Sequence, residues 1–240
     1  MKILNFGSLN IDYSYHVSHI VKPGETLSAH TLIKHCGGKG LNQSIAIVHA
    51  GGEVYHAGYI GKDGKMLLDL CQQTGIFTQH IRIDESMPTG HAVIQVSKTG
   101  QNSIIVHGGA NLCLSEAYID GVLSHFQKGD ILLLQNEINL VDYIIRNAYA
   151  RGMHIYYNPA PYSDDVKNYP LSLLECLIVN ETEGQHLAET EETGAGIIEK
   201  LGEKYSQIDI LLTMGARGCI LRHEGKNISV SAFTVDTVDT

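Results

Sequence analysis

Residues 36–46 read CGGKGLNQSIA and lead into an amphipathic helical pattern that ends near residues 51–52. Paired glycines let a backbone approach a ligand closely, because they carry no Cβ atom. We expect the N-terminus of the following helix to present free N–H groups to hydroxyls or anions, with Lys39 and Asn42 as directed donors. On its glycines alone the stretch is read equally well as a plain turn, so other parts of the chain must decide between a turn and a binding loop.

Strand-like and helix-like segments alternate through the second half of the chain. The strands are expected at 131–135, 153–158, 177–180 and 208–213, and the helices at 141–151 and from 180 to 205. Continuous apolar strands separated by amphipathic helices are typical of a parallel sheet covered on both faces.

The first half contains shorter segments in which apolar and polar residues partly alternate. They lie at 12–19, 27–35, 90–96 and 103–107, and turn residues join them. This pattern predicts antiparallel strands in a small sheet outside the main one, and a lid is the natural use of such a sheet. We therefore expect a single α/β domain over residues 1–240, with lid strands drawn from about 12–35 and 90–107.

Composition excludes several classes of protein. The formal net charge of −9 argues against general nucleic-acid binding, which needs a basic surface. The apolar runs are far shorter than the ~20 residues of a membrane span, and the N-terminus lacks signal-peptide features, so we expect a cytoplasmic protein without a membrane segment. The 5 cysteines are scattered, which predicts reduced thiols and no zinc site. Neither a P-loop nor the G-x-G-x-x-G fingerprint of dinucleotide-binding folds occurs.

A series of motifs runs along the whole chain in an order that is informative. They are GSLNID at 7–12, PGET at 23–26, GGKGLNQ at 37–43, GAN at 109–111, NPAP at 158–161, NETE at 180–183 and TMGARG at 213–218. Their order and approximate spacing resemble those of ribokinases in the PfkB carbohydrate-kinase family. The resemblance implies a doubly wound, mostly parallel α/β sheet with a small β-sheet lid. It also implies transfer of the γ-phosphoryl group of ATP to a sugar hydroxyl.

The resemblance assigns a sugar site to the first part of the chain. The matching positions are Asn10, Asp12, Gly38, Lys39, Asn42 and Glu137. These residue types suit a polyol, which needs several fixed donors and acceptors, and a carboxylate can accept two hydroxyl protons.

The resemblance places the nucleotide near Asn180, Thr213 and Gly215. It gives Glu183 a role in binding Mg²⁺, mostly through water, and it gives Asp239 a role in a site for a monovalent cation, with K⁺ as an activator. The spacing of Asn180 and Glu183 is equally typical of a helix capping box.

In the family, the segment that matches 233–240 continues into a glycine-containing turn that ends in an aspartate, the catalytic base. The resemblance therefore implies that the base follows Thr240, and that the C-terminal part of the fold and any catalytic residue lie outside this sequence. We expect the 240-residue chain to be inactive as a kinase while it still binds sugar. A truncated form of an active kinase is favoured over a natural short form that only binds sugar.

Ribose is the expected substrate, because Lys39 and Gln43 both fit the ribokinase form of the glycine motif. A phosphofructokinase, a nucleoside kinase and a non-catalytic sugar-binding protein are the alternatives. The expected partners are the sugar and ATP, and relatives lead us to expect a homodimer formed through the lid.

Overall fold

The computed structural model describes residues 1–234, so Asp239 lies outside the described residues. Contacts within the chain define two compact units. Unit 1 consists of residues 1–126 and 137–140, and unit 2 consists of residues 127–136 and 141–240. The single domain expected from the sequence stays a prediction, and each unit is described by itself.

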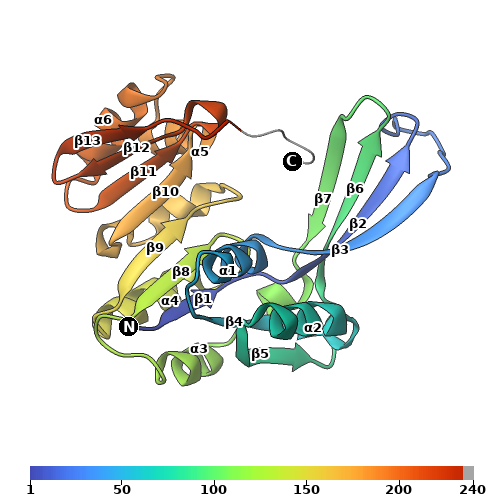
Figure 1. Ribbon diagram of the computed structural model, residues 1–240, viewed down its shortest axis with the longest axis horizontal. Coiled ribbons are helices and arrows are strands. Elements are labelled where there is room, and N and C mark those ends of the chain that lie inside the picture. Colours follow the sequence, from blue (N-terminus) through green and yellow to red (C-terminus); the bar gives the residue numbers. More distant parts are fainter. Residues whose placement is uncertain (235–240) are drawn as a thin grey trace. The chain divides into compact units, whose positions relative to one another are not determined.

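Unit 1 contains a parallel sheet with helices on both faces (Figure 1). Its strands lie in the order β1 (Ile3–Phe6), β4 (Val54–Gly61) and β5 (Phe77–Asp84). Helices α1 (Lys39–His49) and α2 (Lys65–Thr74) pack on one face, and α3 (Glu116–Leu123) lies on the other. Short 3-10 turns η1 (Lys62–Gly64) and η2 (Gly109–Leu112) follow β4 and β7.

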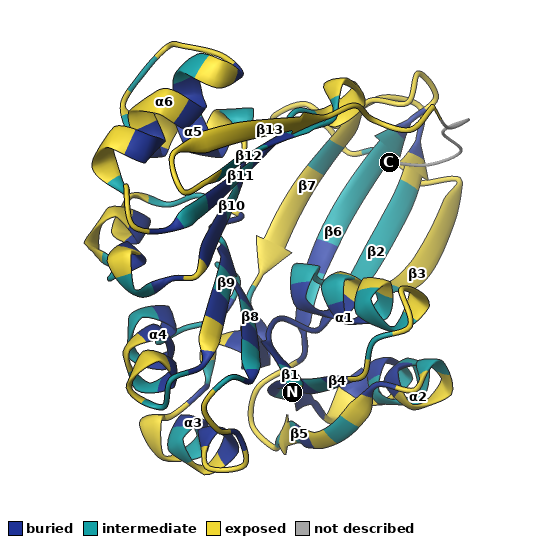
Figure 2. Cartoon of the chain, turned by 60° about the vertical axis from the view of Figure 1, so that its left-hand side comes forward, coloured by how far each residue is buried: buried dark blue, intermediate teal, exposed yellow. Residues whose placement is uncertain are grey.

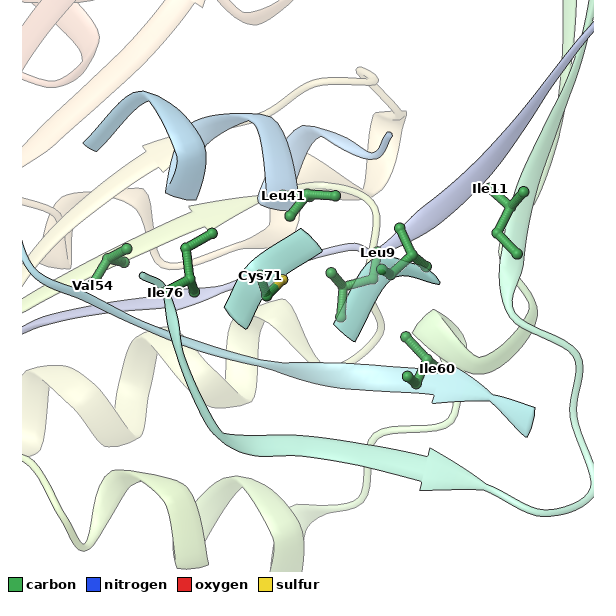
Figure 3. Close-up of a cluster of buried hydrophobic side chains, with 8 residues drawn as sticks. Leu9, Ile11, Leu41, Val54, Ile60, Cys71 and Ile76 are labelled. Carbon is green, nitrogen blue, oxygen red and sulfur yellow. The ribbon is translucent and has the colours of Figure 1, made fainter. Parts of the chain in front are cut away.

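The face covered by α1 and α2 holds a cluster of buried hydrophobic side chains (Figure 3). Its members are almost fully buried aliphatic side chains and one thiol, namely Leu9, Ile11, Leu41, Val54, Ile60, Leu67, Cys71 and Ile76. Leu9 and Ile11 come directly before and inside strand β2, so this core anchors the start of the second sheet of the unit.

That second sheet is four-stranded, in the order β3-β2-β6-β7. Its strands are β2 (Asn10–Val17), β3 (Thr31–Gly37), β6 (Gly90–Ser97) and β7 (Asn102–His107). The β2–β3 and β6–β7 pairs are antiparallel as predicted, but the central β2–β6 pair is parallel, so the expectation of a wholly antiparallel sheet was wrong. Figure 2 shows β2 and β6 half-buried and the outer strands β3 and β7 largely exposed.

Unit 2 contains a mixed sheet in the order β13-β12-β11-β10-β9-β8. The parallel strands are β8 (Ile131–Gln135), β9 (His154–Asn158), β10 (Cys176–Asn180) and β11 (Asp209–Thr213), and the antiparallel ones are β12 (Cys219–His223) and β13 (Lys226–Val230). Its helices are α4 (Val141–Ala150), α5 (Glu181–Ala188) and α6 (Ala195–Lys204), with 3-10 turns η3 (Asp164–Asn168), η4 (Leu171–Leu173) and η5 (Gly215–Arg217).

The helical stretch expected from 180 to 205 is two helices rather than one. Glu189 ends α5 in the left-handed conformation, with φ 54° and ψ 49°, and Gly194 precedes α6 with φ 52°. Each positive φ interrupts the helical geometry, so the chain turns between the two helices.

All 5 cysteines are free thiols, as predicted. Among residues 1–234, no helix combines the length and the apolar character that a membrane crossing requires.

Candidate functional site

The start of β2 carries the first predicted sugar residue, Asn10, between two glycines. Asn10 is paired with Gly37 of β3 on one side and with Gly90 of β6 on the other. A Cβ atom on Gly37 would overlap the Asp12 carboxylate, and a Cβ atom on Gly90 would overlap the amides of Asn10 and Asn111. The two glycines are therefore required by the polar side chains that occupy the space beside them.

Asp12 lies two residues further along β2, on the same face of the sheet as Asn10. Partial burial raises the pKa of its carboxyl above the usual value of 3.8, and repulsion from the Glu137 carboxylate raises it further, while His35 partly opposes both effects. The Asp12 and Glu137 carboxylates, both in unit 1, are therefore close enough to influence each other.

Glu137 is bound to the glycine loop at the start of α1. Its Oε2 atom accepts hydrogen bonds from the Ser8 hydroxyl and from the backbone N–H of Lys39, the latter at 2.9 Å. A carboxylate at this position is favoured by the positive end of the helix dipole. Glu137 is thereby fixed beside Lys39 although 98 residues separate them in sequence.

The backbone donors of α1 are engaged within the protein, which corrects the expectation of free N–H groups. Besides Lys39 N, Gly40 N donates to Ser8 Oγ at 3.2 Å, Leu41 N to Ser8 O at 3.0 Å and Asn42 N to Gly38 O at 3.0 Å. What the loop offers a ligand is therefore side chains: those of Lys39 and Asn42 make no hydrogen bond within residues 1–234.

Gly38 and Gly40 set the shape of this loop. Gly38 has φ 97°, a conformation that L side chains rarely adopt. A Cβ atom on Gly40 would lie 2.5 Å from the backbone nitrogen of Ser8, so only glycine lets the helix start so close to the end of β1.

A buried network beneath the loop holds α1 against the sheet. Asn5 Nδ2 donates to Gly40 O at 2.7 Å and to Ser44 Oγ at 2.8 Å, and Ser44 Oγ lies 2.9 Å from Nδ1 of His56. His56 Nε2 lies 3.1 Å from Gly7 O, and because a carbonyl can only accept, Nε2 carries the proton and Nδ1 accepts from Ser44. Complete burial lowers the pKa of His56 to about 4, so the ring is neutral near pH 7.

The residues predicted for the nucleotide lie at the carboxyl ends of adjacent parallel strands of unit 2. Asn180 ends β10 and Thr213 ends β11, and the two residues are partners in the strand register. Gly215 follows with φ 55°, and no atom of residues 1–234 beyond its chain neighbours lies within 4 Å of a Cβ position there, so these residues leave space beside the loop after β11. Ligands of open α/β sheets bind at this edge.

Glu183 and Asn180 form the capping box that the spacing also predicted. Asn180 Oδ1 accepts from Glu183 N at 2.9 Å, and Glu183 Oε2 accepts from Asn180 N at 3.0 Å. Within residues 1–234 no group of three or more His, Cys, Asp or Glu side chains could hold a metal ion. A carboxylate in the first turn of α5, next to the end of β10, fits Mg²⁺ that is bound mainly by water and phosphate oxygens.

A model of a known family matches the chain from residue 1 to residue 240, and its description is pfkB family carbohydrate kinase. The chain belongs to the pfkB family of carbohydrate kinases. It is a sugar kinase and hence a phosphotransferase. The fold predicted from the sequence, a ribokinase-like α/β sheet with a smaller sheet, is confirmed by the similarity to ribokinase structures.

Relatives of this pfkB-family kinase include ribokinases from several organisms. The ribokinase of Haemophilus influenzae is 34% identical over 241 residues, which cover 98% of this chain and 78% of the relative. The crystal structure of Cryptococcus neoformans ribokinase in complex with ADP matches with a TM-score of 0.85 and 33% identity over 98% of this chain and 79% of that one. Arabidopsis thaliana ribokinase complexed with ribose and ATP matches with a TM-score of 0.86 and 27% identity, over 99% and 80% of the two chains.

Sequence reasoning missed the residues that hold the predicted sugar-binding residues in place. Ser8, Asn111 and His56 donate or accept hydrogen bonds that fix Glu137, Asn10 and the glycine loop. Ser8 and Asn111 lie inside motifs that marked the family, so the motifs contained the signal without a role for these residues. Nothing in the sequence around His56 distinguishes it from the other histidines.

Proposed function

We propose that the chain is an ATP-dependent kinase that phosphorylates a pentose, with ribose as its substrate. The observation that carries the proposal is the set of donors and acceptors in unit 1. Asp12 and Glu137 supply carboxylate oxygens, and Asn10, Lys39 and Asn42 supply side-chain donors, around a loop whose shape depends on Gly38. Such a set suits a polyol with several hydroxyls.

The relatives support the choice of substrates. The similar Arabidopsis protein is a ribokinase complexed with ribose and ATP, and the Cryptococcus protein is a ribokinase in complex with ADP. We extend both substrates to this chain, and we assign the nucleotide to the strand ends of unit 2, near Asn180, Thr213 and Gly215. Glu183 would hold Mg²⁺ mostly through water, and the ion would neutralise charge on the phosphates.

We also propose that the four-stranded sheet is a lid and that two copies of the chain associate through it. On the face that carries Asn10 and Asp12, the strand register places Ile33, Ile94 and Ile104 in one row with Ser14. Ile33 is 39% and Ile104 is 53% exposed. An uncharged aliphatic row of this kind favours association with the same row of a second copy.

Calorimetry with ribose, 2-deoxyribose, fructose 6-phosphate and adenosine tests the substrate, and ribose-dependent formation of ADP is measured with the complete gene product. We expect ribose to bind most tightly. The Asp12→Ala variant should lose sugar binding and keep nucleotide binding, because each sugar hydroxyl left unpaired costs about 1–3 kcal/mol. Unchanged ribose affinity in this variant would refute the assignment of the site.

A further inference from the structure

Asn111 fixes the orientation of a neighbouring side chain, and the hydrogen bonds that do so can be assigned without ambiguity. Its Oδ1 atom lies 3.0 Å from the backbone nitrogen of Leu9, and its Nδ2 atom lies 3.4 Å from the carbonyl oxygen of Leu9. A backbone N–H can only donate and a carbonyl can only accept. The backbone of Leu9 therefore determines which end of the Asn111 amide is oxygen and which is nitrogen.

Asn111 in turn fixes the orientation of the Asn10 amide. Asn111 Nδ2 also lies 2.7 Å from the Asn10 side-chain amide, and since Nδ2 is a donor, the Asn10 atom that faces it must be the acceptor Oδ1. The Nδ2 group of Asn10 is then directed away from Asn111. This NH₂ group makes no hydrogen bond with any of residues 1–234. It is also not enclosed by the protein, since the fully buried polar atoms without a partner do not include it, and so it remains available to a ligand.

The fold holds this amide pair rigidly. Asn111 is 1% and Asn10 is 5% exposed. The η2 turn that carries Asn111 is joined to the start of β6 by a hydrogen bond from Ala110 N to Pro88 O at 2.9 Å, and Gly90 leaves the space that the two amides fill. Rotation of the Asn10 amide by 180° would set its NH₂ group against the NH₂ group of Asn111.

We propose that Asn111 is a positioning residue that makes Asn10 a hydrogen-bond donor toward the sugar. The ligand must then present an acceptor oxygen to Asn10, while Asp12 and Glu137 accept the protons of other hydroxyls. This inference rests on the proposed function of the site. It specifies that Asn10 donates to the sugar, which the residue type alone leaves open, because an asparagine side chain can either donate or accept.

The test uses calorimetry with ribose derivatives in which each hydroxyl in turn is replaced by hydrogen or by fluorine, since fluorine accepts weakly and cannot donate. In the wild type, we expect one position at which the deoxy sugar binds about tenfold or more weakly, with the fluoro sugar in between. In Asn111→Asp, the oxygen that replaces Nδ2 accepts only, so the Asn10 amide turns and directs its oxygen at the sugar. At that position the fluoro sugar should then bind no better than the deoxy sugar.

Asn139→Asp is the matched control. Asn139 pairs with the backbone of Leu114 in the same way, through Oδ1 at 3.0 Å and Nδ2 at 2.9 Å, and among residues 1–234 its side-chain hydrogen bonds go to Leu114 and not to Asn10. This variant should lose similar stability and keep the wild-type ranking of fluoro and deoxy sugars. An unchanged ranking in Asn111→Asp, or the same change in both variants, would overturn the inference.

A second measurement covers the case in which Asn111→Asp fails to fold. In ¹H–¹⁵N spectra of the wild type, ribose should shift the NH₂ signals of Asn10 and leave those of Asn111 nearly unchanged. The opposite pattern would overturn the proposal. If the wild type binds no ribose or other sugar at all, the proposed function fails instead, so the two failures are distinguishable.

Discussion

Asn180 and Glu183 cap the first turn of α5 reciprocally, each accepting a hydrogen bond from the backbone nitrogen of the other. Both residues are also assigned here to the nucleotide and its metal ion. A loss of function after mutation of Glu183 can thus come from a frayed helix or from a lost carboxylate, and the two causes require different substitutions.

Glu183→Gln should separate the two roles from each other. The glutamine oxygen can still accept from Asn180 N, so the free energy of unfolding should stay near that of the wild type, whereas Glu183→Ala should lose about 1 kcal/mol. Both variants should weaken Mg²⁺-dependent ATP binding and leave ribose affinity unchanged. Chemical denaturation and calorimetry measure these quantities, and normal Mg²⁺ dependence in Glu183→Gln would leave Glu183 as a cap alone.

His56 should make the stability of the protein depend on pH between about 4 and 6.5. The folded state keeps the ring neutral, while the unfolded chain protonates it at its usual pKa of 6.5, so the unfolded state binds more protons in this window. The contribution of His56 to the free energy of unfolding is fully present above pH 6.5. It falls as the pH drops to about 4, by roughly 3 kcal/mol in total.

His56→Gln tests this expectation, because glutamine cannot take up the proton. Denaturation curves from pH 4 to 7.5 should give the wild type the larger free energy of unfolding at neutral pH. The difference between the two proteins should shrink toward pH 4. A difference in unfolding free energy that stays constant over this range would show that His56 does not take up a proton on unfolding.

Asp12→Asn should stabilise the protein at neutral pH while it weakens sugar binding. Burial and the Glu137 carboxylate raise the pKa of Asp12, so the folded state resists ionisation of this group. The resulting loss of stability is absent below the usual pKa of 3.8, grows as the pH rises from there, and is complete above the raised pKa.

Thermal unfolding should therefore give Asp12→Asn a higher Tm than the wild type at pH 7 and an equal Tm below about pH 3.8. Ribose should bind about tenfold more weakly, because a charged acceptor is lost. A lower Tm at pH 7 would show that the carboxylate stabilises the fold.

Ile104→Lys should weaken association of two copies of the chain if the lid proposal holds. Ile104 lies on the face of the four-stranded sheet that carries Asp12, and Ile105, its neighbour on β7, points to the opposite face and is 66% exposed. Ile105→Lys is therefore the matched control. In sedimentation velocity, Ile104→Lys should be monomeric, whereas Ile105→Lys should associate like the wild type. Equal effects of both substitutions would contradict the choice of face.

The sequence predicted those elements whose signal is local. Residues 131–135 form β8 within the predicted bounds, and helix α4 matches its prediction to within one residue, because a buried apolar run and an amphipathic period identify each segment by itself. The family was predicted from motifs of a few residues, each of them local as well.

Features that depend on distant partners were beyond such reasoning. The parallel β2–β6 pair joins segments about 80 residues apart, and an alternating pattern is the same in parallel and antiparallel pairs. The backbone donors of α1 were expected to be free because their acceptors, Ser8 and Glu137, are remote in sequence. Glu189 adopts a left-handed conformation that its residue type does not favour, so the end of α5 carried no local signal. Gly194 before α6 was a local signal, and the prediction of a single helical stretch did not use it.

The division of the chain has a consequence for chimeric kinases. Residues 137–140 belong to unit 1, although the stretches on either side of them belong to unit 2. A graft of residues 1–126 onto another kinase scaffold would leave Glu137 behind, and with it the carboxylate that binds Ser8 and Lys39. A transplant of the predicted sugar-binding residues between family members must therefore carry this tetrapeptide as a second, separate insert.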